Sequence, residues 1–373
     1  MPKIIIIGGG FAGLSAAARL SGRKAGVEVL LIDRQERFNF LPMLPDCIGR
    51  GISPVFLTNS LEALSKNLKF SYIKDQVSAV NLEKKQVTVS SGAMEYDYLI
   101  IASGSETNFY GNNAIKQYAY TLDNAEDAQK IKDALKRADY EVFIIGGGGY
   151  TGVEVATNLR VYLNKKSQHK KIIIVERAPS ILGPLPEWMK NYVRNNLRKL
   201  EIECLNNTTI ESIEQTRIKL STGQSFDNAM LIWAAGVRTA DFIQGLKSEK
   251  NPQGRVAVDE YLRLNDSCFV AGDASLVKYK DGFLRMAVQF AITQGELVAA
   301  NIVRQIRGAP LVRLHPIDLG FIIPMANNRS CGRIAGINMQ GFLPTVFHYS
   351  MCVYRTYGLR NKCGIIKDLV TKT

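Results

Sequence analysis

The chain has 373 residues, of which 46% are hydrophobic and 22% charged, a composition that excludes a largely disordered protein and allows two or three domains. The formal net charge is +13, but the basic residues are scattered and form no nucleic-acid-binding motif, so we expect no nucleic acid partner and favour a membrane surface. Met1-Pro2-Lys3 runs directly into a strand pattern, and no apolar stretch approaches about 18 residues, so we expect neither a signal peptide nor a spanning helix.

Two segments of the chain share the order strand, glycine turn, helix, strand. Their strands are nearly continuous apolar runs, which are typical of strands buried on both faces of a parallel sheet. The elements are expected at residues 3–7, 11–23 and 27–33 in the first segment, and at residues 141–145, 151–163 and 171–176 in the second. A duplicated unit of this kind predicts an α/β fold with two Rossmann-like dinucleotide-binding domains.

The first glycine turn places Gly8, Gly10 and Gly13 at the three glycine positions of a G-x-G-x-x-G fingerprint. Glycine there permits a tight turn, a close approach of the backbone to a diphosphate, and close packing of the helix on the strand. We expect the diphosphate at the helix N-terminus, where free N–H groups and the helix dipole favour anions. Asp33 ends the next strand, where it is placed to bind ribose hydroxyls.

The second glycine turn repeats the fingerprint with Gly147, Gly149 and Gly152. Glu176 ends the following strand and is placed to accept hydrogen bonds from an adenosine 2′-hydroxyl. A carboxylate at this position repels a 2′-phosphate, so we expect NADH to be preferred over NADPH. Arg177 weakens this discrimination because an arginine can pair with that phosphate.

The remaining elements lie between and after the two units. In chain order they are strands at residues 87–90 and 95–101 with a turn at Ser91-Gly92, a β segment at 210–226, a buried strand at 268–271, and a long helix at 286–305. Gly272-Asp273 follows the buried strand, and an aspartate on such a turn can hydrogen-bond a ribityl or phosphate oxygen of a cofactor. After residue 310 the chain is rich in aromatic residues, methionine and arginine.

The six cysteines lie far apart and include no CxxC or CxxxxC pair. This spacing argues against a structural zinc site and against a redox dithiol of the glutathione-reductase kind. We therefore expect reduced, mostly buried thiols in a cytoplasmic protein, and no metal.

Taken together, these sequences resemble the two-dinucleotide-binding flavoprotein superfamily, which has the glutathione-reductase-like fold. The junction sequences Ala102-Ser103-Gly104 and Trp233-Ala234-Ala235-Gly236 also match. The resemblance implies that the first unit binds FAD, that the inserted second unit binds NADH, and that Gly272-Asp273 closes on the flavin. It implies a discontinuous FAD-binding domain at 1–115 and 252–310, an NADH-binding domain at 116–251, and a C-terminal membrane-anchoring or dimerisation segment at 311–373.

Within this superfamily the chain resembles the type II NADH dehydrogenases, which are single-subunit NADH:quinone oxidoreductases. The matching sequences are Phe38-Asn39-Phe40-Leu41-Pro42, Ser103-Gly104-Ser105-Glu106-Thr107-Asn108-Phe109-Tyr110-Gly111, Gly152-Val153-Glu154, Trp233-Ala234-Ala235-Gly236-Val237-Arg238 and Val288-Gln289-Phe290-Ala291-Ile292-Thr293-Gln294-Gly295. The resemblance implies transfer of two electrons from NADH through FAD to a membrane quinone, without proton pumping. It also implies a peripheral position on the cytoplasmic face of the cell membrane.

By the same resemblance, Glu154 lies near the flavin as a candidate proton relay or quinone-site residue, and Gln289 borders the quinone headgroup. Thr293 stands where the family usually has a second glutamine, which alters the expected acceptor pocket. The residues expected to contact FAD are Gly8, Gly10, Phe11, Ala12, Gly13, Asp33, Arg34, Pro42, Ser103, Gly104, Gly272, Asp273 and Gln289. Those expected to contact NADH are Gly147, Gly149, Tyr150, Thr151, Gly152, Glu176, Ala235 and Gly236.

The tail mixes apolar and aromatic residues with cations over residues 342–362, a composition that suits an anionic lipid surface if the segment is helical. The alternative for this segment is docking on its own core or in a homodimer. Three alternatives to the quinone reaction remain, of which the first two are a sulfide:quinone oxidoreductase using Cys331 and Cys352, and a soluble NADH-dependent reductase of a redox protein. A non-enzymatic redox sensor that binds flavin or NAD is the third alternative.

Overall fold

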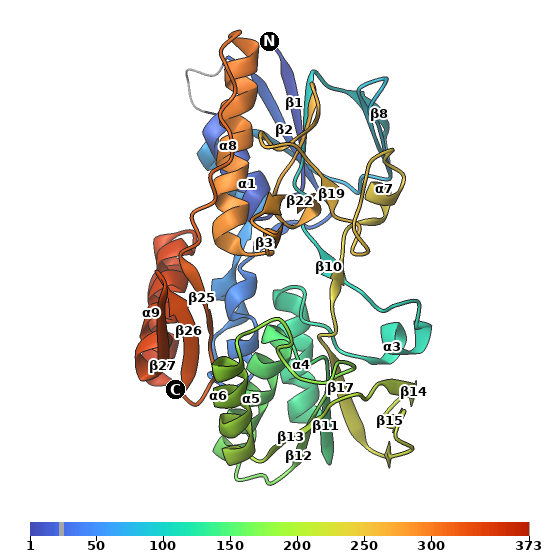
Figure 1. The fold of residues 1–373 in the computed structure, drawn as a ribbon, viewed down its shortest axis with the longest axis vertical. Helices are drawn as coiled ribbons and strands as arrows, with labels where there is room; N and C mark the ends of the chain where they lie inside the picture. Colours follow the sequence, from blue (N-terminus) through green and yellow to red (C-terminus); the bar gives the residue numbers. More distant parts are fainter. Residues whose placement is uncertain (22–25, 373) are drawn as a thin grey trace. The chain divides into compact units, whose positions relative to one another are not determined.

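The computed structural model describes residues 1–21 and 26–372, which group into two units (Figure 1). Unit 1 comprises Met1–Phe38, Asn59–Glu106 and Val237–Ile317, and unit 2 comprises Asn39–Thr58, Thr107–Gly236 and Asp318–Thr373. Four short strands lie where the chain passes from one unit to the other: β3 (Arg37–Asn39), β4 (Thr58–Ser60), β10 (Glu106–Thr107) and β18 (Val237–Arg238). That residues 1–115 and 252–310 bind FAD and residues 116–251 bind NADH stays a prediction.

The central sheet of unit 1 has six strands in the order β20-β21-β9-β1-β2-β5. β1 (Lys3–Ile7) runs parallel to β2 (Glu28–Asp33) and to β9 (Tyr98–Ile101), so that Ile5 lies opposite both Leu30 and Leu99. Residues 4–6 of β1 are fully buried, as the continuous apolar run indicated. The other elements of unit 1 are α2 (Leu61–Leu68), β5 (Ser71–Lys74), β6 (Ala79–Asn81), β7 (Gln86–Val89), β8 (Gly92–Glu95), α7 (Asp241–Gln244), β19 (Val256–Ala257), β20 (Arg263–Asn265), β21 (Cys268–Val270), η4 (Gly272–Ala274), β22 (Ser275–Leu276), β23 (Lys278–Tyr279) and β24 (Gly282–Phe283).

Two helices of unit 1 pack side by side, α1 (Phe11–Leu20) and α8 (Val288–Ile306) (Figure 1). They approach most closely where Gly295 of α8 faces the backbone of Ala12, because a Cβ on Gly295 would clash with the carbonyl oxygen of Ala12. The glycine near the middle of α8 therefore fixes the separation of the two helices. This packing places the first turn of α1 close to the residues that precede Gly295 in α8.

The central sheet of unit 2 has four parallel strands in the order β13-β12-β11-β17. β11 (Val142–Gly146) pairs with β12 (Lys171–Val175) and β17 (Ala229–Trp233), and the buried core contains Ile145, Ile174 and Met230. The helix that follows β11, α5 (Tyr150–Lys165), contributes Val155 and Leu159 to this core. The other elements from this part of the chain are η1 (Leu41–Met43), η2 (Pro45–Cys47), η3 (Pro54–Leu57), α3 (Asn113–Tyr118), α4 (Ala125–Arg137), α6 (Glu187–Lys199), β13 (Ile202–Leu205), β14 (Ile210–Glu214), β15 (Arg217–Leu220) and β16 (Ser225–Phe226).

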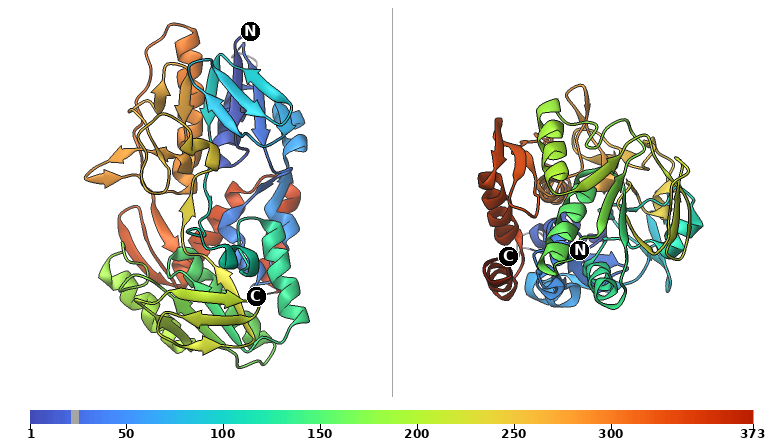
Figure 2. Two further views of the ribbon diagram at one scale, coloured as in Figure 1. Left: turned by 90° about the vertical axis from the view of Figure 1, so that its right-hand side faces the viewer. Right: turned by 90° about the horizontal axis from the view of Figure 1, so that it is seen from below.

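The end of the chain forms a small antiparallel sheet and two helices, which Figure 2 shows in red. The sheet contains β25 (Gly320–Ile323), β26 (Ser330–Ile334) and β27 (Ile337–Gly341), and the helices are α9 (Phe342–Arg355) and α10 (Leu359–Thr371). Helix α10 packs on η3, where Asn361 Nδ2 donates to the Thr58 carbonyl at 3.0 Å and Ser53 N donates to Asp368 Oδ2 at 2.9 Å. The three-stranded sheet was not predicted from the sequence.

Several predicted boundaries differ from those of the structure. The strand expected at 95–101 is two strands, because Tyr96 N donates to Lys85 O and Asp97 accepts from Lys3 N, which turns the chain from one sheet into another. The first helix ends at Leu20, and residues 22 and 23 of the predicted helix lie outside the described residues. The helix expected from residue 286 begins at Val288, after an extended Ala287.

Candidate nucleotide-binding sites

The first glycine turn joins β1 to α1 at the carboxyl end of the unit 1 sheet. Gly8 has φ +106°, a backbone conformation that residues with a Cβ rarely adopt. A Cβ on Gly13 would clash with the carbonyl oxygen of Gly8, whereas a Cβ on Gly10 would meet no atom within 4 Å. The turn is therefore closed on the strand side and open above Gly10. An open backbone at a helix N-terminus is the geometry that receives a diphosphate.

Asp33 is fixed beside this turn by two backbone donors. Gly9 N donates to Asp33 Oδ2 at 2.6 Å, and Gln35 N donates to Asp33 Oδ1 at 2.7 Å. Burial raises the pKa of Asp33 above its ordinary value, while these hydrogen bonds and the charge of Arg34 oppose that rise. Arg34 forms an ion pair of 3.0 Å with Glu106.

The second glycine turn repeats this arrangement in unit 2. Gly147 has φ +109°, and a Cβ on Gly152 would clash with the carbonyl oxygen of Gly147. Gly148 N donates to Glu176 Oε2 at 2.7 Å, and Ala178 N donates to Glu176 Oε1 at 2.8 Å. A Cβ on Gly149 would meet no atom within 4 Å, so this turn is also open at the start of its helix.

A third element of unit 1 is the turn that contains Gly272 and Asp273. Ser105 Oγ donates to Asp273 Oδ2 at 2.9 Å, and burial raises the pKa of Asp273. Gln294, which is buried in α8, accepts from Gly272 N at 2.6 Å and from Ser275 Oγ at 3.0 Å. Sequence reasoning did not assign a role to Gln294. In the sequence, the feature that could have indicated Gln294 is its position directly before Gly295, the glycine at which α8 approaches α1.

The residues of unit 1 fit an FAD molecule. Ser103 Oγ is buried and has no hydrogen-bond partner among the described residues, so it is available to a ligand. A Cβ on Gly8 would lie 2.9 Å from Ser103 Cα, which places Ser103 directly beside the first glycine turn. Gly104 follows with φ +66°. The open N-terminus of α1, the Asp33 carboxylate and this orphaned hydroxyl together provide the donors and acceptors that a flavin dinucleotide requires.

The other predicted FAD residues divide between the units. Phe11 packs edge-on against Phe38, with 5.1 Å between ring centroids, and Ala12 is the residue that Gly295 approaches. Gln289 lies in the first turn of α8 and is partly exposed. Pro42 lies in η1 of unit 2, while all other predicted FAD residues belong to unit 1.

The predicted NADH residues all belong to unit 2. Tyr150 begins α5 and packs edge-on against Phe321, with 5.8 Å between ring centroids. Tyr150 and Thr151 are both exposed. A Cβ on Gly147 would lie 2.7 Å from Ala235 Cα, so the second turn abuts Ala235. Next to it, Gly236 lies beneath the hydroxyl of Tyr110, which sequence reasoning had not placed in this site.

Glu154 and Thr293 differ in how their polar atoms are used. Glu154 is partly exposed in the second turn of α5, and its pKa is raised well above the ordinary value by desolvation and by the charge of Asp46. The Thr293 hydroxyl bonds back to its own helix, to the carbonyls of Gln289 at 3.1 Å and Phe290 at 3.2 Å. Thr293 therefore does not present the long amide that the family pattern has at this position.

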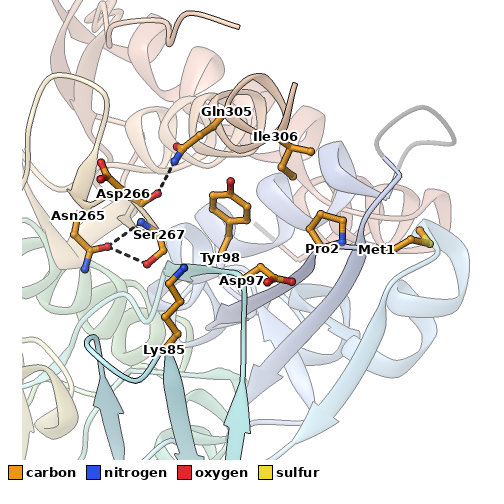
Figure 3. A pocket seen from close by; sticks show the side chains of 10 residues that line it. All are labelled: Met1, Pro2, Lys85, Asp97, Tyr98, Asn265, Asp266, Ser267, Gln305 and Ile306. Carbon is orange, nitrogen blue, oxygen red and sulfur yellow. Dashed lines mark hydrogen bonds between the residues drawn. The ribbon is translucent and has the colours of Figure 1, made fainter. Parts of the chain in front are cut away.

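An open pocket of about 890 Å³ lies at the amino end of the unit 1 strands (Figure 3). Its lining includes Met1, Pro2, Asp97, Tyr98, Asp266 and Gln305. Parallel α/β sheets bind nucleotides at the carboxyl ends of their strands, where both glycine turns lie. This pocket is therefore not the nucleotide site.

Comparisons with known proteins agree with this geometry. The family model described as pyridine nucleotide-disulphide oxidoreductase matches residues 2–295. A type II NADH:quinone oxidoreductase of Staphylococcus saprophyticus is 25% identical over 367 residues, covering 91% of each chain. The demethylphylloquinone reductase NdbB of Synechocystis is 26% identical over 360 residues, covering 91% of this chain and 88% of that protein.

Among solved structures, NDH2 from Plasmodium falciparum in complex with NADH matches with a TM-score of 0.85 at 18% identity. The match covers 99% of this chain and 97% of that chain, so the two proteins share the fold along their length. The family model spans most of the sequence, and the structure forms both glycine turns of this chain. The chain therefore belongs to the pyridine nucleotide-disulphide oxidoreductase family.

Proposed function

We propose that the protein is an FAD-dependent NADH:quinone oxidoreductase of the type II kind, which transfers two electrons without pumping protons. The observation that carries the proposal is the repeated pairing of a glycine turn with a strand-end carboxylate, at Asp33 and again at Glu176. Two such sites suit two dinucleotides. The curated relatives that align over 91% of the chain are named for quinone reduction, which supports a quinone as the acceptor.

When bound, FAD would supply the chemistry of accepting a hydride from NADH and passing two electrons to a quinone. The residues of this chain would bind and orient the two nucleotides and the quinone. In unit 1, the N-terminus of α1 and Asp33 would hold the diphosphate and ribose, and Ser103 and Asp273 would offer further hydrogen bonds. Gln294 fixes the turn that carries Asp273. We propose that Gln289 and Glu154 serve the quinone, the latter as a proton donor.

In unit 2, the open turn at Gly149 would receive the NADH diphosphate, and Glu176 would accept from the adenosine ribose. Both Glu176 oxygens already hold backbone N–H groups, so the carboxylate is fixed in position. A fixed negative charge disfavours the 2′-phosphate of NADPH. The Arg177 guanidinium lies over the Tyr110 ring at 5.9 Å, where it offers the phosphate a counter-charge. NADH is the proposed donor.

Sulfide chemistry is not favoured by the two cysteines assigned to it. Cys331 and Cys352 are both buried free thiols. Burial raises the pKa of Cys331 to about 12 and the pKa of Cys352 well above its ordinary value. A sulfur carrier needs a thiolate, which these environments disfavour.

The proposed membrane contact is the outer face of α9. Six apolar or aromatic side chains on this face are 40% to 73% exposed: Phe342, Leu343, Val346, Phe347, Met351 and Tyr354. The opposite face is buried through Pro344, Thr345, Tyr349 and Cys352. Within the described residues, no helix combines the length and apolarity needed to cross a bilayer. A docked helix that exposes its apolar face suits peripheral attachment to a lipid surface.

The charge of the chain favours the cytoplasmic leaflet, because anionic lipids give that surface a negative potential. A net charge of +13, together with exposed Arg360 and Lys367 near α9, supplies the attraction. We propose a peripheral position on the cytoplasmic face of the membrane. A homodimer through the same helix face is the alternative use of this surface.

Steady-state assays of the purified flavoprotein test the reaction. We expect NADH to be oxidised in the presence of a short-chain quinone, and sulfide to give no turnover. Replacement of Cys331 by serine should leave NADH:quinone activity unchanged. Turnover with sulfide that disappears in Cys331→Ser would replace this proposal with sulfur chemistry. NADH oxidation only with a ferredoxin or rubredoxin would make the protein a soluble reductase.

A further inference from the structure

A buried carboxylate in unit 2 has no role in the reaction described so far. Asp46, in η2, is 4% exposed. The Tyr349 hydroxyl of α9 donates to Asp46 Oδ1 at 2.8 Å, and Arg50 Nε lies 3.4 Å from the same oxygen. Asn158 of α5 also hydrogen-bonds this carboxylate. Three parts of unit 2 therefore converge on one acidic side chain.

The backbone brings Asp46 close to Glu154. A Cβ on Gly49 would clash with the backbone oxygen of Asn158, so the segment after η2 presses directly onto α5. Asn158 lies one turn after Glu154, and its Nδ2 donates to the Glu154 carbonyl at 3.0 Å. The same amide thus joins the Asp46 carboxylate to the turn that carries Glu154. The charge of Asp46 is one of the two causes that raise the pKa of Glu154.

Arg50 balances the charge of Asp46. Its guanidinium is 4.7 Å from the centre of the Tyr349 ring, and its Nη2 donates to Asn328 Oδ1 at 2.6 Å. Arg50 and Asp46 are almost fully buried, so their charges are weakly screened. The titratable and charged groups that surround the two carboxyls are Cys47 and Arg50 from the η2 segment, His348, Tyr349, Cys352 and Arg355 from α9, and Lys132 and Lys165 at the edge of the cluster.

Their surroundings act differently on the two carboxyl groups. Burial raises the pKa of Asp46 to about 6, while Arg50, Tyr349 and Asn158 oppose the rise. Burial and the Asp46 charge raise the pKa of Glu154 well above its ordinary value. The Arg50 charge therefore favours the ionised form of Asp46, whereas burial and the Asp46 charge both favour the protonated form of Glu154.

Resting on the proposed quinone reaction, we propose that Asp46 is a positioning residue that keeps Glu154 protonated between turnovers. The overall reaction is NADH + H⁺ + quinone → NAD⁺ + quinol. The hydride carries two electrons and one of the quinol hydrogens, and the second comes as a proton from water. The Glu154 carboxyl O–H bond breaks as the proton passes to a quinone oxygen. The Glu154 carboxylate, facing ionised Asp46, then takes a proton from solvent.

Infrared titration of the resting flavoprotein tests this role without turnover. The readout is the carbonyl stretch of a protonated carboxyl group, assigned to Glu154 by its loss in Glu154→Gln. In Asp46→Asn, which removes the neighbouring charge, we expect the Glu154 titration midpoint to fall by about one pH unit or more. An unchanged midpoint in folded Asp46→Asn overturns the proposal.

Asp368→Asn is the matched control. Asp368 is also a buried aspartate of unit 2, yet it accepts from Ser53 N and pairs with Lys372 in α10. Its replacement should leave the Glu154 midpoint where it is in the wild-type protein. An equal shift in both variants would mean a general loosening of unit 2 and would contradict a specific role for Asp46.

Tyr349→Phe keeps every charge and provides a second test if Asp46→Asn does not fold. In the wild-type protein, the Glu154 carbonyl frequency should change as Asp46 ionises beside it. Loss of the Tyr349 hydrogen bond should move that change to higher pH, because the Asp46 carboxylate loses a donor. A frequency that stays constant through this range contradicts the proposal. If wild-type protein failed to reduce quinone, the proposed function would fall, whereas these titrations address the Asp46–Glu154 coupling alone.

Discussion

Asp33 and Glu176 accept the same pair of backbone hydrogen bonds in their respective units. Each takes one from the middle glycine of its turn and one from the residue two positions after itself. The carboxylate is thereby held at the open start of the following helix before any ligand arrives. Because these donors and acceptors are already in position, less free energy is lost in ordering protein groups when the ligand binds. This duplication is the structural basis of a two-dinucleotide enzyme.

Alanine replacements in the first turn should separate binding from folding. Gly10→Ala places a methyl group in open space, so the protein should fold normally and lose FAD affinity by about tenfold or more. Gly13→Ala forces a clash with Gly8 and should lower the free energy of unfolding by about 1–3 kcal/mol. FAD content and thermal denaturation of the two variants measure the difference. Normal FAD content in Gly10→Ala would contradict the assignment of this turn.

Gly149→Ala is the corresponding change in unit 2. Its Cβ also meets no atom within 4 Å, so we expect a folded protein that retains FAD. The KM for NADH should rise about tenfold because the methyl group obstructs the diphosphate. Loss of FAD instead of NADH binding would reverse the roles of the two turns.

Replacing Glu176 by glutamine should relax the choice of nucleotide. The amide keeps the size of the side chain but removes the charge that repels a 2′-phosphate. The ratio of kcat/KM for NADH to that for NADPH should fall by about tenfold or more. Adding Arg177→Ala should restore part of the ratio, because the phosphate loses its counter-charge. An unchanged ratio in Glu176→Gln would mean that other groups select the nucleotide.

The two sheets were predictable from sequence because buried parallel strands read as apolar runs and glycine turns have fixed spacing. β1 was predicted to the residue, at Lys3–Ile7. The Asp46 cluster could not be predicted, since Asp46, Asn158 and Tyr349 are far apart in sequence and meet only through tertiary packing. The break between β8 and β9 also depends on tertiary contacts, with Lys3 and Lys85. The three-stranded sheet β25-β26-β27 has short strands with several exposed residues and carries no strong apolar alternation.

The buried Asp46 should make stability fall as pH rises through a defined window. Its pKa is 3.8 ordinarily and about 6 in the folded protein, so between these values the unfolded chain has lost a proton that the folded chain retains. Unfolding therefore becomes easier as pH rises from about 4 to about 6, by up to about 3 kcal/mol, and this contribution is constant above that range.

Denaturant unfolding at several pH values measures this contribution. The two tryptophans, Trp188 and Trp233, both lie in unit 2, so their fluorescence reports on the unit that contains Asp46. The pH-dependent loss should be absent from Asp46→Asn. Parallel pH profiles for the two proteins would show that Asp46 is not held in the buried environment described above.

Acidic replacements on the outer face of α9 should weaken lipid binding. Leu343→Glu combined with Phe347→Glu puts two negative charges on an exposed apolar face, which anionic lipid disfavours. Less protein should sediment with anionic liposomes, while NADH:quinone activity with a short-chain quinone persists. Phe283→Glu, which changes an exposed phenylalanine of β24, is the control. Equal sedimentation of all three proteins would exclude α9 as the membrane contact, and a change from dimer to monomer would assign the face to a homodimer.

Anaerobic titration of the flavin absorbance tests the central claim most directly. The holoenzyme is mixed first with NADH and then with a short-chain quinone, and the flavin band is followed throughout. We predict that NADH bleaches the flavin and that the quinone restores it, which would establish both half-reactions on one protein. A flavin that NADH does not bleach, or one that stays bleached when quinone is added, would contradict an NADH:quinone oxidoreductase.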